Sequence, residues 1–311
     1  MIGTGIEVFA MDKSIVSHQP DFKFHGWQSP CNDGSVCEYD KTTGLEVLQI
    51  NSIQSLIQAL GYLKFTSKGN QILYRGQTQL YNTGNDDAGQ NLFQPSALRG
   101  VKRIPALTSA KNKISKKVAV LRKMVPRLAN TEQFSDAVLE GLLQQYGIPT
   151  TWFDAVDNIW IALWFACYKS DNSVIIGKNP ESRSFWHMVR RNPRLEEPKD
   201  RFAYVFVLGA DAKNAELIDL RNELPSDYIR PHAQHGVMIR TRGVKSINMF
   251  SLVKGIVRVR LEDALDWLGD GGMLRPESIV PPPNYDSGFK MLLTSERQYA
   301  GKDVIRFPIY C

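Results

Sequence analysis

The apolar positions in the first half of the chain recur mainly at helical spacing. Residues 51–63 and 131–147 each place apolar side chains three or four positions apart, which predicts two amphipathic helices, the second capped at Thr131. Residues 157–168 are apolar almost all round, so we expect a helix buried inside the domain, with its tryptophans in the core.

Short runs of β-branched and aromatic residues dominate the later part of the chain. One strand is predicted to carry Tyr74 and Arg75, and residues 150–155 predict another. Residues 261–269 predict a late helix. Further strands are predicted at residues 173–177, 203–209, 235–240, 247–253, 256–260 and 304–310.

This order of elements predicts an α+β fold, with the helices clustered in the N-terminal half and the strands later. We expect one compact domain without internal repeats. Residues 1–45 are expected to form an N-terminal extension, residues 46–250 the main part, and residues 251–311 strands and a helix packed on the same domain.

Composition narrows the class of protein. A chain of 311 residues, of which 43% are hydrophobic, is long enough to bury a substantial core. It has no run of about 18 apolar residues and no basic start followed by a long apolar stretch, so we expect a soluble cytoplasmic protein without a membrane partner. Its four cysteines lack paired spacing with histidines, and no metal site is predicted.

Positive charge is concentrated in one block. The net charge is +6, but residues 88–131 hold ten Lys and Arg and no acidic residue, so the remaining residues carry a net charge of −4. Such a block favours binding to polyphosphate, although charge runs in general more often form a solvated helix face or a disordered loop. The predicted nucleic-acid-binding residues are Lys102, Arg103, Lys113, Lys116, Lys117, Arg122 and Lys123.

Four motifs occur in a fixed order. They are "YRGQ" at 74–77, "FQPSALR" at 93–99, "LLQQYGIPTTWFDAVDNIWIALWFACY" at 142–168 and "RPHAQHGVMI" at 230–239. Together they resemble the FRG domain, a prokaryotic and phage family named for an aromatic-Arg-Gly signature. The positions that match the family pattern are Arg75, Gly76, Ser96, Arg99, Tyr146, Gly147, Pro149, Thr150, Asp154, Ala162, Phe165, Gln234 and Gly236.

The chain departs from the family pattern at several positions. Gln145 replaces a histidine, Thr151 replaces an arginine, and Ala155 and Val156 follow Asp154 in place of Trp and Thr. If the family's histidine or second arginine takes part in chemistry, this chain must perform that chemistry differently.

The order of these motifs is similar to that of ADP-ribosyltransferases. The resemblance implies a split mixed or antiparallel sheet and NAD as the substrate cofactor. It implies cofactor contacts from Arg75, Gly76, Gln77, Ser96, Arg99, Tyr146 and Thr150, and catalytic roles for Asp154, Gln234 and His235.

The chemistry of NAD cleavage suits these residue types. A pyrophosphate needs a fixed cation such as Arg75, and the developing oxocarbenium needs negative potential, which Asp154 could supply. Gln234 could hold the ribose hydroxyls, but a glutamine cannot act as a base. Candidates for the base are Asp154, Asp157, His235 and Glu223.

Each of these residues also has a plain structural interpretation. Arg75 could pair with a buried carboxylate such as Asp154, and Asp154 could instead cap the helix that begins near Asn158. Tyr146 could be a core residue, and His235 could have a surface or packing role.

The leading hypothesis is therefore an NAD-dependent ADP-ribosyltransferase that acts inside a cell as a toxin or phage-defence effector. Its acceptor would be a nucleic acid, RNA being favoured, or a protein, and an antitoxin or chaperone is a plausible partner. Two alternatives stay open: a non-enzymatic nucleic-acid-binding module, and a metal-dependent nuclease that uses Asp154 and Asp157.

Overall fold

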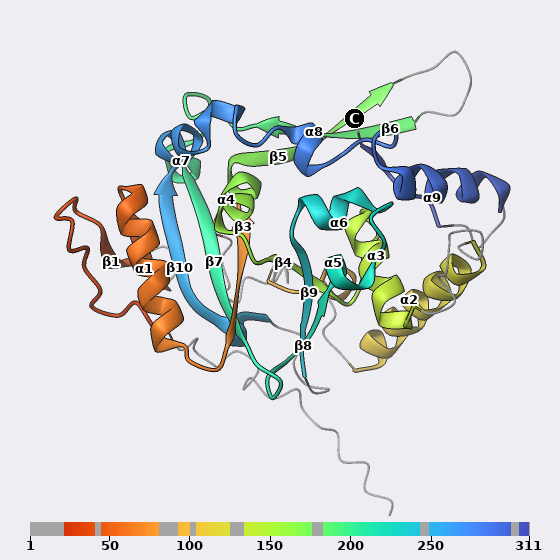
Figure 1. Cartoon of the computed structure of the whole chain (residues 1–311), viewed down its shortest axis with the longest axis horizontal. Coiled ribbons are helices and arrows are strands. Elements are labelled where there is room, and N and C mark those ends of the chain that lie inside the picture. Colours follow the sequence, from red (N-terminus) through yellow and green to blue (C-terminus); the bar gives the residue numbers. More distant parts are fainter. Residues whose placement is uncertain are drawn as a thin grey trace, which may run out of the picture.

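The computed structural model describes residues 22–40, 45–80, 93–99, 104–124, 134–175, 183–242, 249–299 and 305–310. Within these ranges the chain has a mixed α+β fold, with a large mixed sheet, a small second sheet and helices packed around both (Figure 1). None of the helices in these ranges combines the length and the apolar character that crossing a membrane would require.

The large sheet has eight strands in the order β1-β2-β10-β7-β3-β4-β9-β8. The pair β2 and β10 is parallel and the other neighbouring pairs are antiparallel. In spatial order the strands are β1 (Val36–Asp40), β2 (Leu45–Ile50), β10 (Val253–Arg260), β7 (Phe202–Ala210), β3 (Gln71–Gln77), β4 (Phe153–Val156), β9 (Gly236–Thr241) and β8 (Ala215–Asp219).

This sheet divides between β3 and β4. Strand β3 pairs with β7 along its whole length, but among the described residues it pairs with β4 only at Tyr74 and Val156. The guanidinium of Arg75 lies at this division, 4.2 Å from the ring centroid of Phe153. Strand β4 therefore diverges from β3 and continues with β9 and β8 as a second half of the sheet.

Helix α4 (Ile159–Cys167) covers the sheet beside this division. Asn158 caps it, because the Asn158 side chain accepts hydrogen bonds from the backbone N–H groups of Trp160 and Ile161. The helix lies so close to β3 that a Cβ at Gly76 would overlap the carbonyl oxygen of Ala162. Glycine at this position is thus required for helix-to-strand packing.

The small sheet consists of β5 (Tyr168–Ile175), β6 (Arg183–Arg190) and β11 (Ile309–Tyr310). Strand β11 pairs with β6 in parallel, which returns the end of the chain to the middle of the molecule. There the side chains of Pro308 and Tyr310 lie against Gly147, whose φ of +86° is in the left-handed region that favours glycine.

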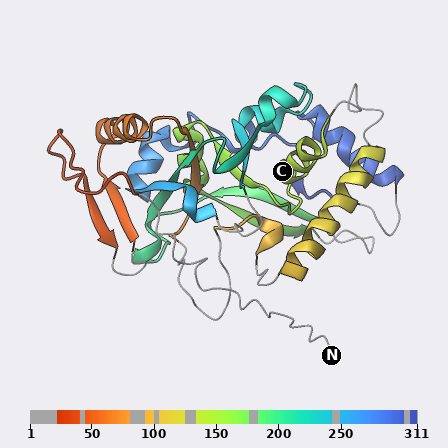
Figure 2. The same ribbon diagram turned by 90° about the horizontal axis from the view of Figure 1, so that it is seen from below.

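The longer helices lie at opposite ends of the molecule. Helix α1 (Ile53–Thr66), capped by Ser52, is at one end, and α2 (Ile104–Met124) is at the other (Figures 1 and 2). Helix α2 packs against α3 (Asp136–Gln145) and α9 (Ser287–Gln298). The α2 side chains buried together with those of α3 and α9 are Ile114, Val118, Leu121 and Met124.

The predicted clustering of helices in the N-terminal half is wrong, because five helices follow residue 219 within the described ranges. They are α5 (Leu220–Glu223), α6 (Ile229–Ala233), α7 (Leu261–Trp267), α8 (Pro276–Ile279) and α9. Most of these are too short for a period of 3.6 residues to be recognisable in sequence. The predicted strand over 247–253 is also wrong, since Met249–Leu252 form a 3₁₀ helix before β10 begins.

Two boundaries also differ from expectation. The side chain of Ser135 caps α3 by accepting a hydrogen bond from Val138 N–H, whereas the predicted cap, Thr131, lies outside the described residues. The extension predicted for residues 1–45 includes β1, which forms the edge of the large sheet next to β2.

Candidate functional site

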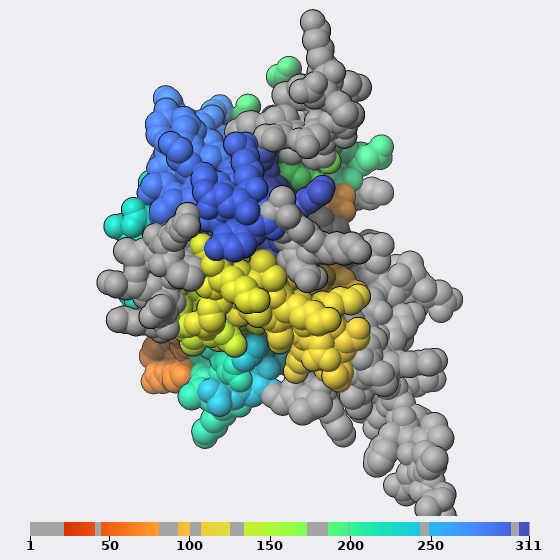
Figure 3. Space-filling view, turned by 90° about the vertical axis from the view of Figure 1, so that its right-hand side faces the viewer, coloured from red at the N-terminus to blue at the C-terminus, as the bar shows by residue number. Residues whose placement is uncertain are grey.

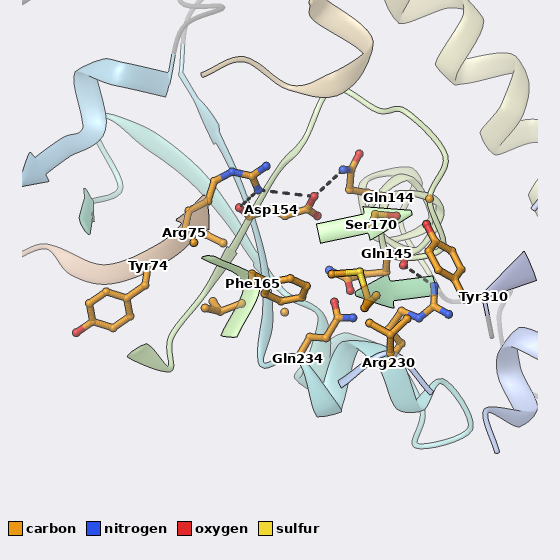
Figure 4. Close-up of a pocket in the computed structure, with 17 residues that line it drawn as sticks. Tyr74, Arg75, Gln144, Gln145, Asp154, Phe165, Ser170, Arg230, Gln234 and Tyr310 are labelled. Carbon is orange, nitrogen blue, oxygen red and sulfur yellow. Dashed lines mark hydrogen bonds and ion pairs between the residues drawn. The ribbon is translucent and has the colours of Figure 1, made fainter. Parts of the chain in front are cut away.

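A cavity of about 360 Å³ lies where the large sheet divides. Its walls come from β3, β4, the end of α3, helix α4, the α6–β9 junction and the three strands of the small sheet, β5, β6 and β11 (Figure 4). Sites for small molecules commonly occupy roughly 300–1,000 Å³ and combine apolar walls with a few convergent polar groups. This cavity has both features.

Four of the residues predicted for the site line this cavity. Arg75, Gly76, Asp154 and Gln234 come from three separate motifs, and the fold brings them together. The predicted residues that are not among the lining residues are Gln77, Ser96, Arg99, Tyr146, Thr150 and His235.

Arg75 and Asp154 face each other across the division of the sheet. The Nη1 group of Arg75 donates to the backbone oxygen of Asp154 at 2.7 Å and lies 3.9 Å from Oδ2 of its carboxylate. The two side chains keep 22% and 36% of their surface exposed, so the pair is accessible from the cavity. The structural interpretation of Arg75 as a partner of Asp154 is therefore correct in its geometry, and the pair lies in the cavity wall.

The hydrogen-bonding capacity of the Asp154 carboxylate is only partly satisfied. Its Oδ2 accepts a hydrogen bond of 2.7 Å from Nε2 of Gln144, while its Oδ1 is buried without a hydrogen-bond partner among the described residues. Desolvation raises the pKa of Asp154 above its ordinary value, although Arg75, the Gln144 amide and Arg99 oppose that rise. Asp154 does not cap α4, because Asn158 fills that role.

Ser96 and Thr150 act behind Gln144 and do not line the cavity. Ser96 begins the 3₁₀ helix Ser96–Leu98, and its backbone lies beside residue 150, where Ala97 N–H donates to the Thr150 oxygen. Both hydroxyls contact Oε1 of Gln144, Thr150 at 2.6 Å and Ser96 at 3.3 Å. The expected direct cofactor contacts of these two residues are thus replaced by contacts to a residue that holds Asp154.

Two further glutamines contribute to the cavity. Gln234 donates from Nε2 to the Ile279 oxygen at 2.8 Å, which leaves its own carbonyl oxygen as an acceptor. Gln145 is 9% exposed, and its Oε1 has no partner within the described part of the chain. The side chain of Gln145 packs against Gly236, where a Cβ would lie 3.0 Å from its Nε2.

Arg230 also lines the cavity and is 1% exposed. Its guanidinium lies 4.5–4.7 Å from the ring centroids of Tyr146, Phe289 and Tyr310. It also donates to the backbone oxygen of Gln145 at 3.2 Å. Desolvation lowers the pKa of Arg230 below its ordinary value. Arg230 is the first residue of the motif at 230–239, and this position in the motif is the sequence signal that points to Arg230.

The cofactor role predicted for Tyr146 is not compatible with its position. Tyr146 is fully buried, and its hydroxyl donates to Oδ2 of Asp286 at 2.7 Å, so it is a core residue. Gln77 is also buried, and it pairs with Tyr204 of β7. The close backbone approach at Gly76 is to α4.

His235 belongs to a different polar cluster. It follows Gln234 with a φ of +51°, and its Nδ1 lies 3.0 Å from Oδ1 of Asp157 and 3.2 Å from Nη1 of Arg221. Arg221 also binds Asp219, at 2.6 Å. The geometry therefore gives His235 and Asp157 ion-pair partners outside the cavity. Glu223, the remaining candidate for the base, is exposed on α5.

The arrangement of acids does not favour the metal-dependent nuclease. Asp154 points into the cavity, whereas Asp157 is held by Arg221 and His235. Within the described ranges no group of three or more His, Cys, Asp or Glu side chains is placed to hold a metal ion.

Part of the basic block lies on α2. Lys113, Lys116 and Lys123 are exposed, and Lys117 is half-buried with a pKa lowered by desolvation and by Lys113. Helix α2 lies on the surface beside α9 (Figure 3). Arg122 pairs with Asp136 at 2.5 Å, and Lys102 and Arg103 lie outside the described residues.

Comparison with known proteins adds no relative. The chain matches no family model, and no curated protein and no solved structure shows significant similarity to it.

Proposed function

We propose that the cavity binds NAD and that the protein is an ADP-ribosyltransferase of the FRG type. One observation carries this proposal: Arg75, Asp154 and Gln234, which come from three separate motifs, meet in a single cavity at the division of the sheet. That division is in keeping with the split sheet that the resemblance implies.

The polar groups of the cavity suit the parts of a dinucleotide. The guanidinium of Arg75 lines the cavity, and guanidinium groups bind the oxygens of an anionic diphosphate in pairs. The carbonyl oxygen of Gln234 can accept hydrogen bonds from ribose hydroxyls, because its amide nitrogen is already bound to Ile279. Asp154 supplies negative potential beside the oxocarbenium that forms when the nicotinamide bond breaks.

The basic face of α2 favours a nucleic acid, and RNA in particular, as the acceptor. Lysines on one exposed helix face can contact successive phosphates without reading sequence. Under this proposal the protein acts inside a cell as a toxin or defence effector, controlled by an antitoxin or chaperone.

The test is nicotinamide release and transfer of labelled ADP-ribose from NAD to RNA, DNA and protein. We expect label in one acceptor class, and its loss in Gln234→Ala and Arg75→Lys. A matched control is Arg190→Lys, which alters a half-exposed arginine paired with Asp270 in the small-sheet region. Intact NAD with the folded wild-type protein in all three acceptor mixtures would reject the proposal.

A second candidate, the non-enzymatic nucleic-acid-binding module, is favoured by the same face of α2. It predicts binding that weakens steeply as salt rises and no turnover of NAD. Replacing Lys113 and Lys116 together by glutamine would reduce the salt dependence of binding under either function. The nicotinamide assay therefore distinguishes the two.

A further inference from the structure

Gln144 connects the cavity to two hydroxyl groups behind it. Its Nε2 donates to Oδ2 of Asp154 at 2.7 Å (Figure 4). Its Oε1 accepts from Thr150 Oγ1 at 2.6 Å and from Ser96 Oγ at 3.3 Å. A single side-chain amide thus contacts three of the residues that the sequence predicted for the site.

The directions of these hydrogen bonds follow from their surroundings. Ser96 Oγ accepts from the backbone N–H of Thr150 at 3.2 Å, and Thr150 Oγ1 accepts from the backbone N–H of Trp152 at 3.2 Å. Each hydroxyl has one hydrogen to donate, and Oε1 of Gln144 is the acceptor within reach of both. The two hydroxyls therefore fix the amide with its oxygen toward them and its NH₂ group toward Asp154.

This orientation favours the ionised carboxylate. An ionised Asp154 accepts from the NH₂ group of Gln144, whereas a flipped amide would place two oxygens against each other. Ser96 and Thr150, which lie outside the cavity, thereby act on the charge of a residue inside it.

We propose that Gln144 is the positioning residue of this site and that Ser96 and Thr150 lock its amide so that Asp154 stays ionised toward the cavity. The catalytic meaning of this inference rests on the proposed function. There, Asp154 takes the proton of an acceptor hydroxyl as that oxygen bonds to C1′ of the ribose. The bond between C1′ and nicotinamide breaks, and its electron pair goes to the ring nitrogen.

Other charged or titratable groups also face this carboxylate. Arg75 on β3 and Arg99 after the 3₁₀ helix lower the pKa of Asp154, and Tyr310 on β11 is near enough for Asp154 to raise its pKa. Arg230 lines the same cavity from α6. All four are unchanged in the variants below, so a shift in those variants comes from the Gln144 network.

The decisive experiment measures the pKa of Asp154 by carbon-13 NMR and the pH dependence of nicotinamide release. Gln144→Met keeps the length of the side chain and removes the donor, Thr150→Val removes one locking hydroxyl, and Thr150→Ser restores it. We expect a higher pKa of Asp154 in Gln144→Met, a smaller rise in Thr150→Val, and a return toward wild type in Thr150→Ser.

The pH profile of activity should change in the same order. Because a hydrogen bond to a charged group contributes about a factor of ten or more, we expect Gln144→Met to be roughly tenfold less active on the acid limb and to recover at higher pH. If the acid limb of the pH profile shifts in Thr150→Val but not in Thr150→Ser, the shift comes from the positioning of Asp154 and not from general damage to the fold.

The outcomes separate this inference from the function that it rests on. An unchanged pKa of Asp154 in a folded Gln144→Met, or equal pKa values in the two Thr150 variants, would overturn the inference even if the wild type cleaves NAD. A shifted pKa without NAD cleavage would reject the proposed function and retain the role of Gln144 in holding Asp154 ionised. If Gln144→Met does not fold, the two Thr150 variants decide.

Discussion

Asp154 and Asp157 lie three residues apart and have opposite surroundings. Both oxygens of Asp157 are paired, Oδ2 with Arg221 at 2.6 Å and Oδ1 with Arg221 at 3.1 Å and His235 at 3.0 Å. Asp154 has one hydrogen bond to Oδ2, from Gln144, a longer contact to Arg75, and a buried Oδ1 without a partner among the described residues.

The difference shows how burial and pairing decide what a carboxylate does. In the Arg221 cluster, hydrogen bonds from Arg221 lower the pKa of Asp219, so the ionised form of Asp219 favours the folded state. In the cavity, desolvation raises the pKa of Asp154, so its ionised form costs stability. A charge that the fold holds at a cost, in a cavity with other polar groups, is typical of a functional site.

The largest expected effect separates the two acids by activity. Asp154→Asn should reduce nicotinamide release by about 10²–10⁴-fold, the usual contribution of a positioned general base. Asp157→Asn should leave the release rate within a few fold of wild type, because Asp157 is not among the residues that line the cavity. Equal losses in the two variants, with both proteins folded, would remove the distinction between the clusters.

The next effect concerns the free energy of unfolding. Arg221→Ala leaves Asp157 and Asp219 without their shared partner, and we expect a loss of roughly 1–3 kcal/mol in urea unfolding. Arg122→Ala, a control on the exposed pair with Asp136, should cost less than about 1 kcal/mol. If the two losses are equal, the Arg221 cluster has no structural role beyond that of a surface pair.

The pH dependence of stability should have opposite signs at Asp219 and Asp154. Asp219 has a lowered pKa in the folded state, so its stabilisation is present above the unfolded value of about 3.9 and is lost as pH falls through the folded value. Asp154 has a raised pKa, so its cost is absent below about 3.9 and grows as pH rises through the folded value.

At neutral pH, Asp219→Asn should therefore unfold more easily than wild type, and Asp154→Asn less easily. In a series of urea titrations the Asp154→Asn difference should close as the pH is lowered toward 4, whereas the Asp219→Asn difference should persist there and close only below about 3.9, as the pH falls toward the folded pKa of Asp219. A destabilised Asp154→Asn at neutral pH would mean that the ionised carboxylate stabilises the fold, contrary to the direction of its pKa.

Part of the site was predictable because it depends on short motifs. Arg75, Asp154 and Gln234 were identified from residue type and order. An apolar run predicted helix α4, and the residues before that run predicted strand β4. The expectation of α+β structure was confirmed, since these patterns are local.

The rest of the site depends on contacts between distant segments. Nothing near Ser96 in the sequence indicates that its hydroxyl would contact Gln144, 48 residues away. The role of Tyr310 depends on the parallel pairing of β11 with β6, and β11 is only two residues long. Tyr146 was assigned to the cofactor because it matched a motif, yet its ring is part of the core around Arg230.

The smallest expected effect tests whether His235 belongs to the cavity or to the Arg221 cluster. Asparagine tolerates the positive φ found at position 235. His235→Asn removes the contact of the His235 ring with Asp157, and the His235 side chain is 40% exposed. Because Asp157 keeps Arg221, we expect a loss below about 1 kcal/mol in urea unfolding and unchanged nicotinamide release. If release instead falls as far as in Asp154→Asn, while stability is unchanged, His235 takes part in the reaction. Asp157 would then orient it, and the two acids would belong to one site.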